Sequence, residues 1–252
     1  MISNNWIAIS DIHGDLLNFN ALLQAIEENE QDYRFIFLGD YVDRGPDSKE
    51  VLATIKYHVD QGHIAILGNH DLFFMEFLKG KYDEFALTFG YDTIYSFLGF
   101  HVMDDHGCAF ARDQILEKFP WVLPLLQSMP YYHEEGELVF IHGGYNPFRS
   151  DWKRSTPVEM TMPVWQMQKH AKHQERPFIS GHFPVINMNK DKSSDPVLSH
   201  RHLFIDGGSV FGGTLNAFFS DGRYVQSENG KLHLKTHQEW RNNVWNLLQS
   251  SE

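Results

Sequence analysis

The first 71 residues contain three short apolar runs, each followed at once by a polar loop. They read WIAI at 6–9 before SDIHG at 10–14, FIFL at 35–38 before GDYVDRG at 39–45, and IAIL at 64–67 before GNHD at 68–71. Asp11, Asp40 and Asn69 follow one another at intervals of 29 residues. A strand, a crossover helix and the next strand need roughly 30 residues. The spacing therefore predicts a parallel sheet that brings these polar residues to one edge, where open α/β sheets bind ligands.

The segments between these runs have helical periodicity, because apolar residues recur at three- and four-residue steps within 15–30 and 46–62. Strand patterns return at 138–141, 178–180 and 203–205, each followed by Gly beside His or Asp. Asp221–Gly222, between the apolar stretches 215–219 and 223–225, is a hairpin signal. The fold class is therefore predicted as α/β, with a more antiparallel second half.

Residues 81–129 contain helical patterns and no strand signal. We expect a single domain over residues 1–252, in which 81–129 form a helical cap beside the sheet edge. The alternative is that this segment only extends the layer of crossover helices.

The amino-acid composition limits the kinds of partner that the protein is expected to bind. The formal net charge is −12, which argues against a nucleic-acid surface because such surfaces need many Lys and Arg. No run approaches the ~20 apolar residues of a membrane span, and the N-terminus has no signal-peptide pattern. The single cysteine, Cys108, cannot form an internal disulfide. We expect a cytoplasmic protein with no membrane contact; the oligomeric state stays open.

Five strand-to-loop junctions each place Asp, His or Asn beside Gly, and together they favour a metal site. Two ions about 3.5–4 Å apart need a bridging ligand, and the central Asp40 suits this role. The other candidate ligands divide into Asp11 and His13 for one ion, and Asn69, His142 and His182 for the other. Carboxylate, imidazole and amide ligands together suit Mn, Fe or Zn rather than Ca. We therefore expect two divalent ions, with Mn as the first choice, that lower the pKa of a shared water molecule.

The residues beside these candidate ligands suit phosphate chemistry. His70, next to Asn69, could protonate the leaving oxygen as a general acid, and either Asp43 or Asp71 could hold its other ring nitrogen. Arg44 has a planar guanidinium that suits phosphate oxygens, so it is predicted to bind the substrate together with His70.

The motifs D-I-H-G-D at 11–15, G-D-Y-V-D-R-G at 39–45 and G-N-H-D at 68–71 resemble those of the PPP-type, calcineurin-like metallophosphoesterases. The resemblance continues through I-H-G-G at 141–144, S-G-H at 180–182 and I-D-G-G-S-V-F-G-G at 205–213. It implies two mixed β-sheets in an α-β-β-α sandwich and a dinuclear centre containing Mn or similar ions. The residues that it implies as ligands are Asp11, His13, Asp40, Asn69, His142 and His182. It further implies His70 as the acid, Asp43 as the partner of His70, and Arg44 as a phosphate ligand.

Two positions depart from the family pattern. Bacterial members often have Trp-x-Arg after the first C-terminal histidine, whereas this chain has Trp165-Gln166-Met167. A second phosphate-binding arginine is therefore missing at Met167. Its role could fall to one of the nearby basic residues Arg149, Lys153 and Arg154.

The other departure, Asp71 in the third motif, favours the diadenosine tetraphosphatases, whereas the D-Y-V-D-R-G spelling is typical of the protein phosphatases. The predicted function is a metal-dependent phosphomonoester hydrolase of the bacterial serine/threonine protein phosphatase type, acting on a phosphoprotein or a small phosphoester. The alternative is a dinucleoside polyphosphate hydrolase. A third interpretation is a binding module that has lost turnover.

Overall fold

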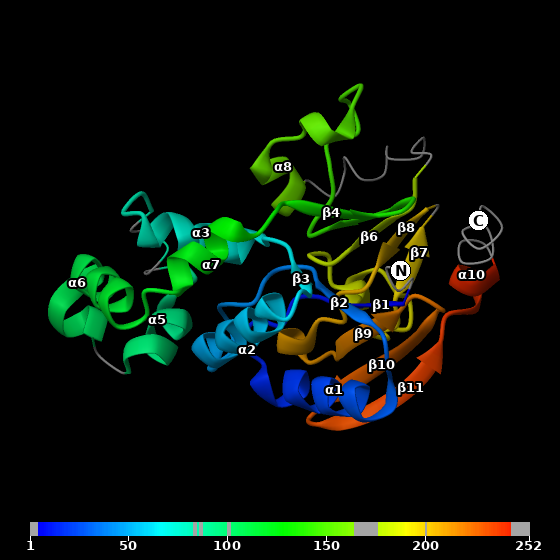
Figure 1. Ribbon diagram of the computed structural model, residues 1–252, viewed down its shortest axis with the longest axis horizontal. Coiled ribbons are helices and arrows are strands. Elements are labelled where there is room, and N and C mark those ends of the chain that lie inside the picture. Colours follow the sequence, from blue (N-terminus) through cyan, green and yellow to red (C-terminus); the bar gives the residue numbers. More distant parts are fainter. Residues whose placement is uncertain are drawn as a thin grey trace.

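The computed structural model describes residues 5–82, 85, 88–99, 102–163, 176–199 and 201–242. Within them, two β-sheets pack face to face and helices cover their outer sides (Figure 1). The predicted α/β class and two-sheet sandwich are confirmed.

The larger sheet has the strand order β11-β10-β9-β1-β2-β3 in the described part of the chain. Its strands are β1 (Trp6–Ile9), β2 (Arg34–Phe37), β3 (Ile64–Ala65), β9 (Leu215–Phe219), β10 (Arg223–Glu228) and β11 (Lys231–Thr236). Strands β1, β2 and β3 are parallel neighbours, as their spacing predicts. Their carboxyl ends therefore meet at one edge.

The smaller sheet has the order β4-β5-β6-β8-β7. Its strands are β4 (Tyr132–Glu135), β5 (Leu138–Ile141), β6 (Phe178–Ser180), β7 (Val197–Ser199) and β8 (His202–Phe204). Strands β5, β6 and β8 are parallel, and only the outer strands β4 and β7 pair antiparallel. The second half is therefore more antiparallel than the first, as predicted, although β5, β6 and β8 are parallel. The hairpin around Asp221–Gly222 is confirmed by the pairing of β9 with β10.

Alternation along the central strands divides the core into layers. In β1, Trp6 and Ala8 face the second sheet, while Ile7 and Ile9 face the helices. Because both faces are covered, this strand is apolar throughout, as expected for a central strand of a parallel sheet. Each large apolar side chain buried in this way contributes about 1.5–3 kcal/mol to stability. The polar residues that follow the strands are therefore held by a rigid base.

Helices α1 (Leu16–Asn29) and α2 (Ser48–Asp60) connect the parallel strands and cover the outer face of the larger sheet. Asp15 caps α1 by accepting a hydrogen bond from the Asn18 N–H, 3.2 Å away. Helix α3 (Asn69–Leu78) follows β3 and begins at Asn69. Asn69 and His70 thus lie in the first turn of a helix.

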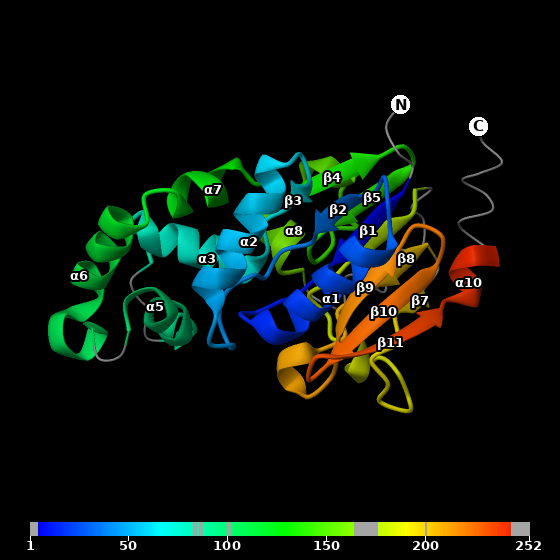
Figure 2. The ribbon, with the colours of Figure 1, turned by 60° about the horizontal axis from the view of Figure 1, so that its bottom comes forward.

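Residues 91–128 contain α5 (Tyr91–Leu98), α6 (Val102–Lys118), which is kinked at Gly107, and α7 (Val122–Ser128). They form a lobe at the far end of the molecule from α10 (Gln238–Trp240), as both views show (Figures 1 and 2). The predicted helical character of this region is confirmed where the chain is described.

The remaining short helices are η1 (Trp152–Arg154), α8 (Pro157–Thr161), η2 (Val185–Asn187) and η3 (Ser209–Phe211). Among the helices of the described ranges, none is both long enough and apolar enough to cross a membrane.

Candidate active site

Loops from both sheets meet at the carboxyl edge of β1, β2 and β3. The first two loops are joined by backbone hydrogen bonds, from the Asp11 N–H to the Gly39 carbonyl (3.1 Å) and from the His13 N–H to the Asp40 carbonyl (2.9 Å). From the second sheet, the Gly181 N–H donates to the His142 carbonyl (2.9 Å). All these loops therefore form one connected surface.

The loops of this edge hold unusual backbone conformations. Of nine non-glycine residues with positive φ in the described part of the chain, six lie here: Asp11, His13, Asp40, Asp43, Arg44 and His182. Such conformations cost on the order of 1–3 kcal/mol each and concentrate at functional sites. Strain gathered at one edge indicates that the position of these side chains matters more than local stability.

The Asp40 carboxylate stands at the centre of the site. Its Oδ2 lies 3.5 Å from Nε2 of His13 and 3.4 Å from Nε2 of His142. Two groups whose ligand atoms all lie within 4.8 Å share this carboxylate: Asp40 with His13 and His70, and Asp40 with His142 and His182. A carboxylate common to two groups is the arrangement that a bridged pair of ions requires.

Hydrogen bonds orient two of these imidazole rings. Nδ1 of His13 lies 2.8 Å from the Val42 carbonyl, and Nδ1 of His142 lies 2.7 Å from the Leu38 carbonyl. A carbonyl can only accept, so each Nδ1 carries a proton and each ring turns its Nε2 toward Asp40. Burial opposes the charged form of His142, but the Asp40 carboxylate raises its pKa to about 10, so this ring is protonated on both nitrogens unless a cation takes the place of the second proton. Metal-binding histidines are held in this way in proteins.

The centre brings acceptor atoms together. Oδ1 of Asn69 lies 3.1 Å from Nε2 of His142, which in turn lies 3.4 Å from Oδ2 of Asp40. Burial and the neighbouring charge on His142 lower the pKa of His182 to about 3, which favours its neutral, ligating form. A buried set of carboxylate, amide and imidazole groups fits divalent cations of the Mn, Fe or Zn kind.

Asp11 lies beside these groups without belonging to either. Its Oδ2 accepts hydrogen bonds from the Ser10 hydroxyl and from the His182 N–H, the latter at 2.9 Å. Burial, opposed by the charge of His142 and reinforced by that of Asp40, raises the pKa of Asp11. The structure therefore brings together all six predicted ligands, but it places His70, rather than Asp11, in the group with His13.

His70 is paired with Asp43. Its Nδ1 lies 2.7 Å from Oδ2 of Asp43, whose side chain is fully buried. Burial opposes the charged form of His70, but the Asp40 carboxylate and the hydrogen bond to Asp43 outweigh it and raise its pKa. Thr93 of α5 donates its hydroxyl proton to Oδ1 of Asp43 and accepts the Asp43 N–H at 2.9 Å. No sequence signal marks Thr93, because it lies in an ordinary helical pattern far from the motifs.

Asp71, the other predicted partner of His70, has a different role. Its carboxylate accepts backbone N–H groups from Asp40 (2.7 Å), Tyr41 (2.9 Å) and Gly68 (2.9 Å). It therefore fixes the second loop against the third. Of the two alternatives, the structure places Asp43 at the ring nitrogen of His70.

Arg44 lies at the exposed mouth of the centre. Its two terminal nitrogens lie 2.7 Å from Nε2 of His13 and 3.0 Å from Nε2 of His70. The guanidinium thus faces the same space as the ligand atoms, where an anion would gain its charge and its planar donors.

The position of the missing second arginine is not described by the structure, because Met167 lies outside the described residues. Of the basic residues considered as replacements, Arg149 is paired with Glu159 (2.9 Å) and Lys153 with Glu134 (2.7 Å). Both are committed to carboxylates, whereas Arg44 is aimed at the centre.

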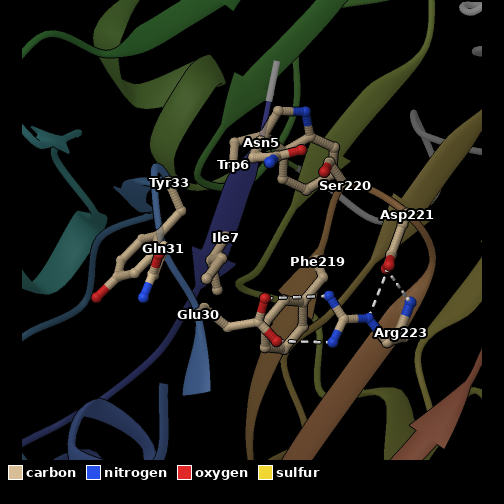
Figure 3. Close-up of a pocket in the computed structure, with 10 residues that line it drawn as sticks. All are labelled: Asn5, Trp6, Ile7, Glu30, Gln31, Tyr33, Phe219, Ser220, Asp221 and Arg223. Carbon is tan, nitrogen blue, oxygen red and sulfur yellow. Dashed lines mark hydrogen bonds and ion pairs between the residues drawn. The ribbon is translucent and has the colours of Figure 1, made fainter. Parts of the chain in front are cut away.

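A pocket of about 210 Å³ lies at the opposite, amino end of β1 and β2. Figure 3 shows its polar wall, where Arg223 faces both Glu30 and Asp221. Arg223 lies 2.6 Å from Glu30 and 2.7 Å from Asp221. Because these charges are already paired, the pocket offers little to a charged ligand.

Comparison with known proteins agrees with this geometry. The calcineurin-like phosphoesterase family matches residues 6–243. The symmetrical bis(5'-nucleosyl)-tetraphosphatase of Nitrosospira multiformis is 30% identical over 140 residues, which are 56% of this chain and 43% of the relative. The serine/threonine-protein phosphatase 1 of Salmonella typhimurium is 25% identical over 215 residues, 83% of this chain and 88% of that relative. The chain therefore spans less than half the length of the tetraphosphatase and most of the protein phosphatase.

Solved structures share the fold. A candidate diadenosine tetraphosphatase superposes with a TM-score of 0.61 at 17% identity, over 93% of this chain and 94% of that chain. The cold-active protein-tyrosine phosphatase of a psychrophilic Shewanella species superposes with a TM-score of 0.53 at 16% identity, over 91% and 80%. The family match covers nearly the whole length, so this chain belongs to the calcineurin-like phosphoesterase family.

Proposed function

We propose that this chain is a two-metal hydrolase that cleaves dinucleoside polyphosphates. The observation that carries the proposal is the buried Asp40 carboxylate between two histidine groups, with Arg44 and His70 at their mouth. The tetraphosphatase relatives favour this substrate class over phosphoproteins. The order of preference drawn from the sequence alone is thereby reversed.

We assign the metal ligands as Asp11, His13, Asp40, Asn69, His142 and His182, with Mn²⁺ as the first ion to test. When bound, two divalent ions would polarise the phosphoryl group and lower the pKa of the attacking water. His70 remains a competitor of Asp11 for the first ion, but its bond to Asp43 suits an acid better.

The chain's own residues position the substrate and move the proton. Arg44 presents two N–H donors to the phosphoryl oxygens and orients the phosphorus over the centre. His70 gives the proton on Nε2 to the leaving oxygen, while the buried Asp43 holds its Nδ1–H and stabilises the charged ring. Thr93 fixes the Asp43 carboxylate, so its role is positioning.

The helical segment 81–129 is proposed as a cap within a single domain. Thr93 reaches Asp43, and the Phe89 ring lies 5.7 Å from that of His70. These contacts favour a cap over a mere extension of the outer helix layer.

A protein phosphatase is the second candidate. The Salmonella phosphatase aligns with most of the chain, and its coverage of both proteins exceeds that of the tetraphosphatases. A substrate comparison under Mn²⁺ decides between the two. We expect diadenosine tetraphosphate to give two molecules of ADP, with a higher kcat/KM than phosphoserine or phosphotyrosine peptides. Faster turnover of a phosphopeptide, with diadenosine tetraphosphate left intact, would assign the chain to the protein phosphatases.

A further inference from the structure

Two large aromatic side chains remain exposed beside the candidate centre. Phe89 is 48% exposed and Phe211 is 54% exposed. The Phe211 ring lies 4.8 Å from Cζ of Arg44, and the Phe89 ring lies 5.7 Å from the His70 ring at 79°. Arg44 and His70 are themselves 3.0 Å apart. Both rings therefore border the space where the phosphoryl group is proposed to bind.

Phe211 is held by its own tight loop. It ends η3, between Gly208 (φ 74°) and Gly212 (φ 84°), two positions that favour glycine. The Gly213 N–H closes the loop on the Gly208 carbonyl at 2.9 Å. The Ser209 hydroxyl ties it to Asp15, the cap of α1. The ring is therefore presented on a fixed support rather than on a free loop tip.

Phe89 is held by contacts with Phe85 and with Phe73 of helix α3. Its N–H donates to the Phe85 carbonyl at 3.0 Å, and its ring stacks on Phe73 of α3, with centroids 6.3 Å apart and planes at 17°. Helix α3 also carries His70. The ring of Phe89 is thus fixed to the same element as the proposed acid, although nearly half of its surface stays open.

We propose that Phe89 and Phe211 form a subsite that stacks the nucleobases of the substrate. This inference rests on the proposed function and names the part of the substrate that the polar centre leaves unrecognised. A dinucleoside polyphosphate carries a planar base at each end of its phosphate chain, and two aromatic rings border the phosphate site. Stacking of a base on an aromatic side chain is worth about 1–3 kcal/mol, so a flat, half-exposed ring is a suitable partner. A second cationic contact at Met167 is then unnecessary for tight binding.

The test compares substrates with and without a base. Phe89→Ala and Phe211→Ala should each raise KM for diadenosine tetraphosphate by roughly 5- to 150-fold. The kcat value should change little, because the stacked base takes no part in the bond changes and is bound equally in the ground and transition states. Inorganic tetraphosphate, which has the same phosphate chain and no base, should be affected less than about twofold. Phe211→Trp should retain or lower KM for diadenosine tetraphosphate.

Phe110→Ala serves as the matched control, because Phe110 is a 42% exposed phenylalanine on α6 that contacts His106. It should leave both substrates unchanged. Equal losses on diadenosine tetraphosphate and inorganic tetraphosphate would overturn the subsite, since the rings would then only support the centre. Circular dichroism of each variant identifies one that does not fold; Phe→Leu, which keeps a large apolar side chain and loses the flat ring, then takes its place with the same expected outcome.

Failure of the proposed function gives a different result. If the wild-type enzyme leaves diadenosine tetraphosphate intact, competition against p-nitrophenyl phosphate turnover tests the subsite directly. ADP should inhibit more strongly than pyrophosphate, and the difference should vanish in Phe89→Ala and Phe211→Ala. A selective loss on phosphotyrosine peptide, with no change for ADP, would overturn the nucleobase as occupant and assign the rings to a tyrosine side chain.

Discussion

The two ends of β1 and β2 differ in how their polar groups are satisfied. At the amino end, Arg223 meets Glu30 and Asp221, and every charge has a partner (Figure 3). At the carboxyl end, the buried Asp40 carboxylate faces the Nε2 atoms of His13 and His142 at 3.5 and 3.4 Å, and all these atoms can bind a cation. The same strands thus carry a pocket of paired charges at one end and a cluster of potential metal ligands at the other.

This difference shows that a cavity does not by itself identify the functional site. A buried carboxylate such as that of Asp40 is costly unless a protonated imidazole or a metal ion is paired with it. The strained backbone of the carboxyl end adds to that cost. A fold that gathers both features at one edge reserves that edge for function.

Removal of the shared carboxylate should have the largest effect. Asp40→Asn takes away the charge common to both histidine groups, and a metal centre supplies several kcal/mol of transition-state stabilisation. We expect kcat/KM to fall by roughly 10³–10⁵-fold, and by less in His13→Asn. Steady-state kinetics under saturating Mn²⁺ checks this order. An Asp40→Asn enzyme more active than His13→Asn would contradict the bridging role.

Loss of the proposed acid should come next. His70→Asn should slow hydrolysis of an alkyl phosphate such as phosphoserine by roughly 10²–10⁴-fold. The deficit should be smaller on p-nitrophenyl phosphate, whose leaving group scarcely needs a proton. Metal content should stay unchanged. Equal deficits on both substrates would show that His70 is not the acid.

The next prediction concerns Asp71, whose carboxylate joins the second and third loops of the carboxyl edge by accepting three backbone N–H groups. Asp71→Asn replaces one acceptor oxygen by an N–H₂ group, so at least one of the three backbone N–H groups loses its partner. An unsatisfied buried donor costs about 1–3 kcal/mol. Urea unfolding should show a loss of this size, with reduced activity. Unchanged stability would mean that water replaces the lost acceptor.

We expect substitutions at the amino end of the strands to change the stability of the protein rather than its activity. His58 packs on Phe35 near the start of β2, and burial, with the charge of His63, lowers its pKa to about 4. The unfolded chain, with a pKa near 6.5 for histidine, binds the proton first as pH falls. Stability is therefore full above pH 6.5 and is lost between pH 6.5 and 4, by on the order of 2 kcal/mol.

His58→Leu should flatten this part of the stability profile, measured by urea unfolding at several pH values. His233→Leu, an exposed histidine on β11, is the control. A profile that stays equally steep in His58→Leu would assign the loss to other groups.

The paired charges of the pocket should matter least. Arg223→Ala removes two ion pairs that are partly exposed, and each such pair contributes about 0–1 kcal/mol. We expect a small change in the free energy of unfolding and no change in kcat/KM. A large loss of activity would contradict the contrast between the two ends.

The sequence predicts the carboxyl edge well, because parallel strands at regular spacing must align Asp11, Asp40 and Asn69. It cannot choose between Asp43 and Asp71, since both lie close to His70 along the motifs and only the folded loops separate them. The sequence does not reveal the roles of Phe89, Thr93 and Phe211, because the residues that they contact lie far away along the chain. The pairing of β9 with β1 and the parallel order of β5, β6 and β8 depend on similarly long-range contacts.

The central claim is a dinuclear centre built around Asp40. Elemental analysis of the active enzyme, titrated with Mn²⁺ while turnover of p-nitrophenyl phosphate is followed, tests it most directly. We expect activity to rise until two ions are bound per chain, and Asp40→Asn to hold fewer. Full activity with one ion per chain, or with none, would contradict the claim.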